Sequence, residues 1–165
     1  MKKIGLISDT HSYLHPRVFH HFETCDEIWH AGDIGQLELA DKLDDFKPLR
    51  AVYGNIDGTE IRKQYPKNLW FTLEGVSVWM THIGGYPGRF PKNIYAELKA
   101  KKPGLFICGH SHILKAVPDP KLNLLHLNPG AAGKVGFHQV LTLMRFELHN
   151  AQVQNLEVIE LEKRA

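Results

Sequence analysis

Residues 3–11 read Lys-Ile-Gly-Leu-Ile-Ser-Asp-Thr-His, and this stretch decides the fold class. Its apolar run is short, continuous and bounded by polar residues, which is typical of a buried strand. Two runs of the same kind follow, each ended by a glycine and a polar residue: residues 27–31 before Gly32-Asp33, and residues 49–53 before Gly54-Asn55. Between them, Pro16 suits the first turn of a helix to about residue 24, and residues 37–46 have helical apolar spacing. This alternation of strand and helix is typical of a layered α/β sheet.

The remaining sequence indicates hairpins more than helices. The expected strands are residues 70–73, 76–80 and 105–108, with one helix over 94–100. After residue 113, short strands are separated by turns at 118–123, 128–133 and 150–151. We therefore expect one α/β domain over residues 1–165, with two packed mixed sheets and helices outside. A βαβ half would join a hairpin-rich half.

Composition narrows the functional class. The chain has 165 residues, 20 Lys and Arg against 18 Asp and Glu, and only two cysteines. The small positive charge does not indicate binding of a nucleic-acid polymer, and two cysteines do not form a disulfide framework. No apolar run approaches a membrane span or a signal sequence, so we expect a cytoplasmic protein that does not bind membranes. The unusual number is 11 histidines.

Five polar clusters follow predicted strands, where open α/β sheets place their ligands. They are Asp9-Thr10-His11, Gly32-Asp33, Gly54-Asn55, Thr81-His82 and Gly109-His110-Ser111-His112. Each cluster supplies nitrogen or oxygen donors suited to a metal ion, and none supplies a cysteine. If the chain is extended there, residues two apart in Asp9/His11 and in His110/His112 project to the same side. The glycines permit sharp turns and close backbone approach.

The number of candidate ligands indicates two metal ions rather than one. The seven candidates are Asp9, His11, Asp33, Asn55, His82, His110 and His112. A single zinc-like site takes four ligands, whereas seven with one shared carboxylate fit two ions about 3.5–4 Å apart. The site would keep a small positive charge, because the charge of two dications exceeds that of two carboxylates and a bridging hydroxide. This positive charge suits an anionic phosphoester. Asp33, Asn55 and His82 are the candidate catalytic residues within this set.

These motifs, in this order, resemble the calcineurin-like metallophosphoesterase superfamily. The short chain and the Gly-Asn-Ile-Asp sequence at 54–57 resemble its small phosphodiesterase branch, which includes the retromer subunit of the same fold. The resemblance implies a four-layer αββα sandwich. It also implies two metal sites, with these ligands: Asp9, His11, Asp33 and His112 for one, and Asp33, Asn55, His82 and His110 for the other. Manganese is the metal it most favours, with iron, zinc, nickel or cobalt as alternatives.

The resemblance further implies hydrolysis of a small phosphoester by a hydroxide that bridges the metals. A phosphodiesterase is the leading hypothesis. A phosphomonoesterase using the same site, or a noncatalytic scaffold of the retromer-subunit type, is the alternative. All seven ligands are present, which favours an enzyme. Oligomeric state is left open, including a homo-oligomer.

Some positions depart from the family pattern or stay ambiguous. Larger superfamily members have a histidine general acid where this chain has Ile56, so we expect slow turnover of esters with poor leaving groups. The branch often has serine where Ala131 stands. Arg89 is either a phosphate ligand or a solvated loop residue, and neighbouring Tyr86 and Phe90 either stack on a substrate or anchor the loop. His30 either supports the metal ligands or is a core histidine.

Overall fold

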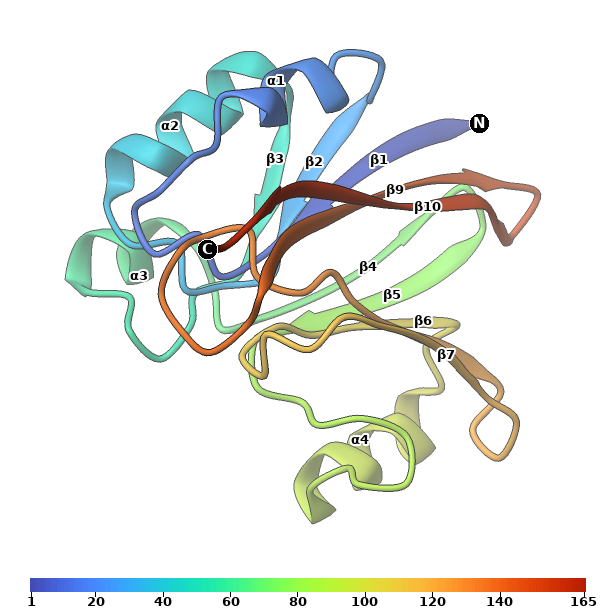
Figure 1. Ribbon diagram of the computed structural model, residues 1–165. Helices are drawn as coiled ribbons and strands as arrows, with labels where there is room; N and C mark the ends of the chain where they lie inside the picture. The colour runs from blue at the N-terminus through green and yellow to red at the C-terminus, as the bar shows by residue number, and fades with distance from the viewer.

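The computed structural model describes all 165 residues and contains two five-stranded sheets that pack face to face (Figure 1). The first sheet has the order β10 (Gln152–Lys163), β9 (Val140–His149), β1 (Lys2–Ile7), β2 (Glu27–His30) and β3 (Leu49–Ala51). The second has the order β4 (Asn68–Leu73), β5 (Val76–Thr81), β6 (Leu105–Ile107), β8 (Leu124–Asn128) and β7 (Lys115–Asp119). The expected pair of mixed sheets is confirmed.

Each sheet is built around three parallel strands flanked by antiparallel ones. In the first sheet β1, β2 and β3 run parallel, and in the second sheet β5, β6 and β8 do. The strands beside these, β9 in the first sheet and β4 and β7 in the second, pair antiparallel with them, and the edge strand β10 pairs antiparallel with β9. Because the carboxyl ends of parallel strands meet at one sheet edge, each sheet gathers its strand-ending loops at one place.

Helices cover the outer faces of both sheets and complete four layers (Figure 1). The four helices are α1 (Arg17–His21), α2 (Leu37–Phe46), α3 (Thr59–Gln64) and α4 (Lys92–Lys101). The first three contribute Val18, Leu43 and Ile61 to a core on the first sheet, whereas α4 packs on the second sheet through Leu98. A third apolar core lies between the two sheets and contains the fully buried Trp29.

The division into two halves along the chain is wrong. The C-terminal hairpin of β9 and β10 joins the first sheet, where β9 pairs with β1, rather than extending the hairpin-rich sheet. Helix α3 was not expected, and α1 ends three residues earlier than the sequence indicated. Pro118 was assigned to a turn, but it lies in β7, an edge strand, where a missing N–H is tolerated. None of the helices has the length and apolar character needed to cross a membrane.

His126 of β8 gives the fold a predicted sensitivity to acid. Its ring is fully buried against Phe106 and Phe90, and both ring nitrogens are without hydrogen-bond partners. Burial lowers the pKa of His126 from 6.5 to about 4. The unfolded chain therefore binds a proton between these values while the folded chain does not, so the free energy of unfolding falls as pH decreases through this window.

We expect His126→Phe to remove this part of the acid sensitivity, because a phenyl ring fits among the same aromatic neighbours and does not titrate. Between pH 7.5 and 4.5 the metal-free wild type should lose about 2–3 kcal/mol more unfolding free energy than the variant. Urea denaturation at both pH values measures this difference. Equal losses in the two proteins would contradict the prediction.

Candidate metal centre

The loops that follow the parallel strands of both sheets meet at one end of the sandwich. Loops after the first sheet's parallel strands bear four of the seven candidate ligands: Asp9, His11, Asp33 and Asn55. Loops after β5 and β6 of the second sheet bear the other three: His82, His110 and His112. Backbone hydrogen bonds join neighbouring loops, from His11 N to Asp33 O and from Gly109 N to His82 O, both at 3.0 Å. The site therefore depends on both sheets.

Five of the seven candidates have left-handed backbone conformations. Their φ angles are 53° at Asp9, 46° at His11, 56° at Asp33, 70° at His110 and 61° at His112. Such conformations disfavour most side chains and concentrate at functional sites, where surrounding structure enforces them. The expectation of an extended chain at Asp9/His11 and His110/His112 is therefore wrong. Tightly curved loops, rather than strand alternation, bring these pairs together.

Asp9 presents one carboxylate oxygen to the centre and keeps the other for structural hydrogen bonds. Oδ2 accepts from the Ser8 hydroxyl at 2.7 Å and from the His110 N–H at 3.1 Å. Oδ1 is buried without a hydrogen-bond partner and lies 3.2 Å from His112 Nε2 and 3.9 Å from His11 Nε2. The ligand atoms of these three residues all lie within 4.8 Å of one another, a spacing that suits a shared cation.

Asp33 lies between this group and a second one. Its Oδ1 accepts the Ile56 N–H at 3.1 Å, while Oδ2 lies 3.4 Å from His11 Nε2 and 3.2 Å from His82 Nε2. Asp33, His82 and His110 also have ligand atoms within 4.8 Å of one another. The carboxylate thus faces both groups, as a shared ligand requires.

His82 is oriented by the chain for use of its Nε2 atom. Its Nδ1 lies 2.7 Å from the Ala31 carbonyl oxygen and donates to it, which leaves the buried Nε2 without a hydrogen-bond partner. Burial lowers the pKa of His82, but the carboxylates of Asp33 and Asp9 outweigh it, so the pKa lies above its ordinary value. Burial likewise raises the pKa of Asp33, and His82 more than reverses that effect. Without a cation, Asp33 and His82 thus stabilise each other's charged forms.

The two remaining candidates stand at the solvent side. Asn55 is exposed, and its Oδ1 lies 3.0 Å from His110 Nδ1. Burial lowers the pKa of His110, which keeps its imidazole neutral and able to bind a metal. All seven sequence candidates are therefore brought into one cluster. Unpartnered buried atoms at Asp9, His11 and His82 fit the electron-pair donors that a divalent cation needs.

Two glycines permit this close approach. A methyl group at Gly54 would overlap the Asp33 carboxylate, and one at Gly109 would overlap the Ser8 hydroxyl and the Asp9 carboxylate. The prediction that these glycines allow close backbone contact is confirmed. A side chain at Gly54 would displace the Asp33 carboxylate, and one at Gly109 would displace the Asp9 carboxylate.

Three polar residues outside the seven candidate ligands support the loops. The buried Asp57 carboxylate accepts from the N–H groups of Ile34, Gly35 and Gly54 at 2.7–3.1 Å, and so joins the Asp33 loop to the Asn55 loop. Asn128 donates to the Gly109 carbonyl at 3.0 Å. His138 bonds the Gly133 carbonyl and packs edge-on against His112, with ring centres 5.0 Å apart. Asp57 had a sequence signal because it follows the Gly-Asn pair, and Asn128 lies in the turn expected over residues 128–133, whereas His138 had none.

His30 proves to be both a core residue and a support. It is fully buried, its Nδ1 accepts the Gly32 N–H at 3.1 Å, and its Nε2 lies 3.0 Å from the Thr10 hydroxyl. Thr10 in turn donates to the Ile34 carbonyl at 2.9 Å. Burial lowers the pKa of His30 to about 4, so the ring is neutral and its Nε2–H donates to Thr10. Through Thr10, His30 thereby links the loop after β1 to the loop that bears Asp33.

The loop after His82 is anchored rather than folded over the centre. Phe90 packs against Phe106 with ring centres 5.7 Å apart, and the ammonium of Lys115 lies 4.4 Å from the Tyr86 ring centre. Arg89 is exposed; its backbone N–H donates to the Tyr86 carbonyl at 2.8 Å, and its side chain makes no hydrogen bond or ion pair. The anchoring interpretation therefore holds for Phe90 and Tyr86.

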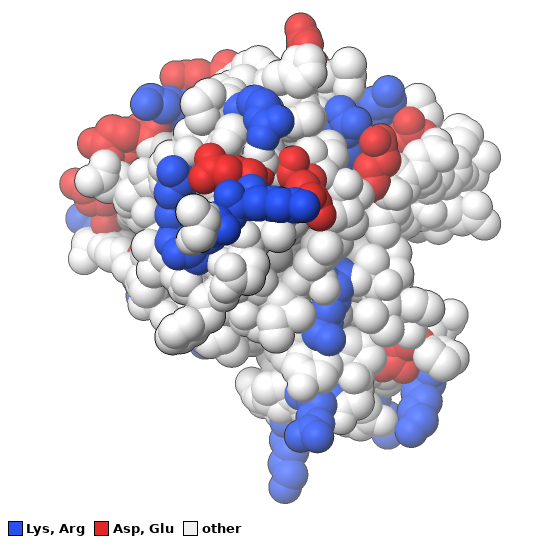
Figure 2. Space-filling model, viewed as in Figure 1, with Lys and Arg blue, Asp and Glu red and all other residues white.

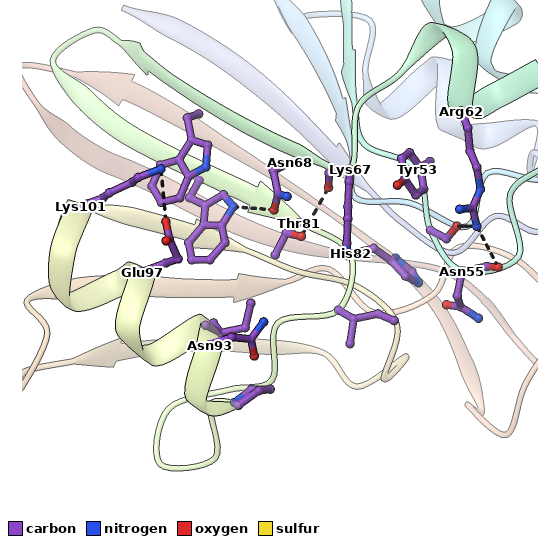
Figure 3. A pocket seen from close by; sticks show the side chains of 16 residues that line it. Tyr53, Asn55, Arg62, Lys67, Asn68, Thr81, His82, Asn93, Glu97 and Lys101 are labelled. Atoms are coloured by element: carbon purple, nitrogen blue, oxygen red, sulfur yellow. Dashed lines mark hydrogen bonds and ion pairs between the residues drawn. The ribbon is translucent and has the colours of Figure 1, made fainter.

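A groove of about 770 Å³ opens beside the centre on the His82 side (Figure 3). Asn55 and His82 belong both to the ligand cluster and to the groove wall. From there the groove extends past Lys67 and Asn68 to Asn93, Glu97 and Lys101 of α4 (Figure 3). Its volume falls in the range of small-molecule sites. A substrate at the centre would therefore have room to extend toward α4.

Comparison with known proteins agrees with this geometry. Residues 1–151 match the family described as the calcineurin-like phosphoesterase superfamily domain. A probable metallophosphoesterase of Methanocaldococcus jannaschii is 31% identical over 78% of this chain and 67% of its own length. The structure of an archaeal phosphodiesterase aligns with a TM-score of 0.75 and 20% identity, covering 96% of this chain and 99% of that one. The structure of zinc-bound Vps29 of Entamoeba histolytica aligns with a TM-score of 0.72 and 18% identity. The alignment covers 97% of this chain and 99% of that one.

Proposed function

Because the chain belongs to the calcineurin-like phosphoesterase superfamily, we propose that it is a divalent-metal-dependent phosphodiesterase acting on a small phosphoester. The observation that supports this most directly is the set of buried, unpartnered atoms Asp9 Oδ1, His11 Nε2 and His82 Nε2 at one centre. Leaving such atoms unpaired is unfavourable unless a ligand compensates. A dinuclear site with Asp33 as the shared ligand accounts for all of them.

The chain's own residues divide the work between holding and orienting. Asp9, His11, Asp33 and His112 would hold one cation, and Asp33, Asn55, His82 and His110 the other. When bound, two such cations would supply an activated water molecule as the nucleophile and would neutralise charge on the phosphoryl oxygens. The Ala31 carbonyl keeps the proton of His82 on Nδ1, so that Nε2 remains available. Asn55 contributes no charge, which leaves the centre positive for an anionic ester.

Leaving-group chemistry limits the substrates that we expect to react. Ile56 stands next to Asn55 and is 46% exposed. Because its side chain is aliphatic, it offers no proton to a departing alkoxide. Esters of acidic alcohols or phenols do not need that proton. We propose manganese as the preferred metal, with iron, zinc, nickel or cobalt as alternatives, and the cytoplasm as the site of action. Zinc bound by the similarly folded Vps29 is consistent with this range.

A scaffold function remains the second candidate because apolar side chains are exposed beside His112. Ile113 is 54% exposed, Val135 54% and Phe137 fully exposed. Exposed apolar groups near a site are typical of contact surfaces for other proteins. The similarity to Vps29 structures shows the fold alone, so the choice between catalyst and scaffold depends on turnover.

The deciding experiment compares bis(p-nitrophenyl) phosphate with p-nitrophenyl phosphate, using protein stripped of metal and then supplied with Mn²⁺. We expect cleavage of the diester only with metal, and a loss of at least about 100-fold in kcat/KM for His112→Ala. His20→Ala is the matched control, because His20 is exposed on α1 away from the centre. Preference for the monoester would establish a phosphomonoesterase instead. Metal binding without cleavage of either ester would favour the scaffold.

A further inference from the structure

The groove beside the metal centre is rich in hydrogen-bond donors and has no unpaired carboxylate. Lys67 is exposed on its wall, and its ammonium group has neither a carboxylate partner nor an aromatic ring over which it lies. Asn68 accepts from Trp79 Nε1 at 3.0 Å, so its amide N–H groups stay free. The only carboxylate in the wall, Glu97, is paired with Lys101 at 3.2 Å. The groove therefore suits a negatively charged, acceptor-rich group.

Arg62 adds a fixed cation where the groove meets the centre. Its Nε donates to the Asp57 carbonyl at 2.6 Å, and its Nη2 reaches the Asn55 carbonyl at 3.4 Å. The guanidinium also lies 4.4 Å from the Tyr53 ring centre. These contacts use one edge of the guanidinium and leave Nη1 unpaired. A cation held in this way binds phosphate oxygens with little loss of side-chain freedom.

The surroundings repeat this charge pattern. The surface over α4 carries mainly Lys and Arg, whereas acidic and basic side chains are interspersed over the upper part of this face (Figure 2). At the α4 end, the ammonium of Lys101 lies 4.4 Å from the Trp70 ring, which stacks on Trp79 with ring centres 4.4 Å apart. Trp79 is only 3% exposed, so the partly exposed Trp70 provides the aromatic surface that reaches the basic groove. This combination suits a nucleoside-sized group that bears a phosphate.

We propose that the groove binds the part of the substrate beyond the scissile phosphate, and that this part carries a second phosphate. The inference rests on the proposed function, because it takes the scissile phosphate to lie at the metal centre. Asn55 and His82 connect the two places, since both line the groove. The positive charge of the centre is used by the first phosphate, so a second one needs Lys67 and Arg62. The substrate class is then a diester of a nucleotide-like bisphosphate.

Two chromogenic diesters test this directly. Both are p-nitrophenyl esters of thymidine 5′-phosphate, and one also carries a 3′-phosphate. We expect the 3′-phosphorylated ester to have a kcat/KM about five- to tenfold higher, mainly through KM. Lys67→Met should bring this ratio close to one. Lys63→Met is the matched control, because Lys63 is exposed next to Arg62 but lies outside the groove.

A binding measurement separates this inference from the proposed function. Trp70 is the partly exposed indole of the groove, whereas Trp29 is fully buried between the sheets. Thymidine 3′,5′-bisphosphate should quench the fluorescence of the Mn²⁺-supplied protein at about five- to tenfold lower concentration than thymidine 5′-phosphate. Trp70→Phe should remove the signal, and Lys67→Met should remove the preference. Preferential binding without hydrolysis of any ester would overturn the phosphodiesterase and support the groove assignment. Equal binding, or a preference unchanged in Lys67→Met, would overturn the groove assignment even if diesters are cleaved.

Discussion

Asp33→Asn is expected to lower Mn²⁺-dependent diester cleavage by at least about 1,000-fold while the fold survives. Asp33 Oδ2 faces His11 on one side and His82 on the other, at 3.4 and 3.2 Å, and it is therefore the carboxylate oxygen that we propose the two metal groups share. An asparagine keeps the carbonyl that accepts the Ile56 N–H, so the loop should hold. What it removes is the negative charge and one oxygen donor between the cations. The loss should therefore fall on metal binding and catalysis.

Thermal unfolding with and without Mn²⁺ provides the second readout for Asp33→Asn. Metal that binds only the folded state raises the unfolding temperature of the wild type, and this rise should be largely lost in the variant. Asp26→Asn is the matched control, because Asp26 also accepts a backbone N–H, from Lys3 at 2.8 Å, but lies at the start of β2 away from the centre. Wild-type activity and metal response in Asp33→Asn would contradict the two-metal centre. A metal-free Asp33→Asn that fails to unfold cooperatively would show that Asp33 is structural.

The composition of the candidate site could be predicted, but its geometry could not. Asp9, Asp33 and His82 each stand two residues after the end of an apolar run, and parallel strands bring such positions to one edge. The sequence spacing does not reveal the left-handed conformations at Asp9 and His110, because aspartate and histidine are also common in extended chain. The support of His112 by His138 was also invisible. That contact depends on how the loop after β8 folds back, which no local pattern encodes.

The same limit applies to the fold. Local patterns predict individual strands, but they do not predict which strands far apart in sequence pair with one another. Strand β1 is readable because Ile4, Leu6 and Ile7 are all buried, which gives a continuous apolar run. The pairing of β9 with β1 joins residues such as Met144 and Leu6, far apart in sequence, and hydrophobicity alone does not choose that partner. Helix α3 has Ile61 as its only buried residue, so it has too little apolar periodicity to be detected.

Asp57 shows how a residue that is not itself a ligand could govern the site. One side chain accepts three backbone N–H groups from two loops, and those loops bear Asp33 and Asn55. Asp57 is only 3% exposed, so water does not replace these hydrogen bonds when the carboxylate is removed. The N–H groups of Ile34, Gly35 and Gly54 would then be left unpaired close to the metal ligands. Both stability and the spacing of the two loops should suffer.

We expect Asp57→Ala to lower the unfolding free energy of the metal-free protein by about 3 kcal/mol and Mn²⁺ affinity by about 10- to 100-fold. Asp119→Ala is the matched control, since Asp119 is also buried and accepts the N–H groups of Lys121 and Leu122, but in the turn between β7 and β8. It should lose about 1–2 kcal/mol and bind Mn²⁺ normally. Urea denaturation and calorimetric titration measure the two quantities separately. A normal Mn²⁺ affinity in destabilised Asp57→Ala would mean that the ligand loops hold their spacing without this carboxylate. Asp57 would then contribute to the fold alone, and the ligand geometry would have to be attributed to the left-handed loops themselves.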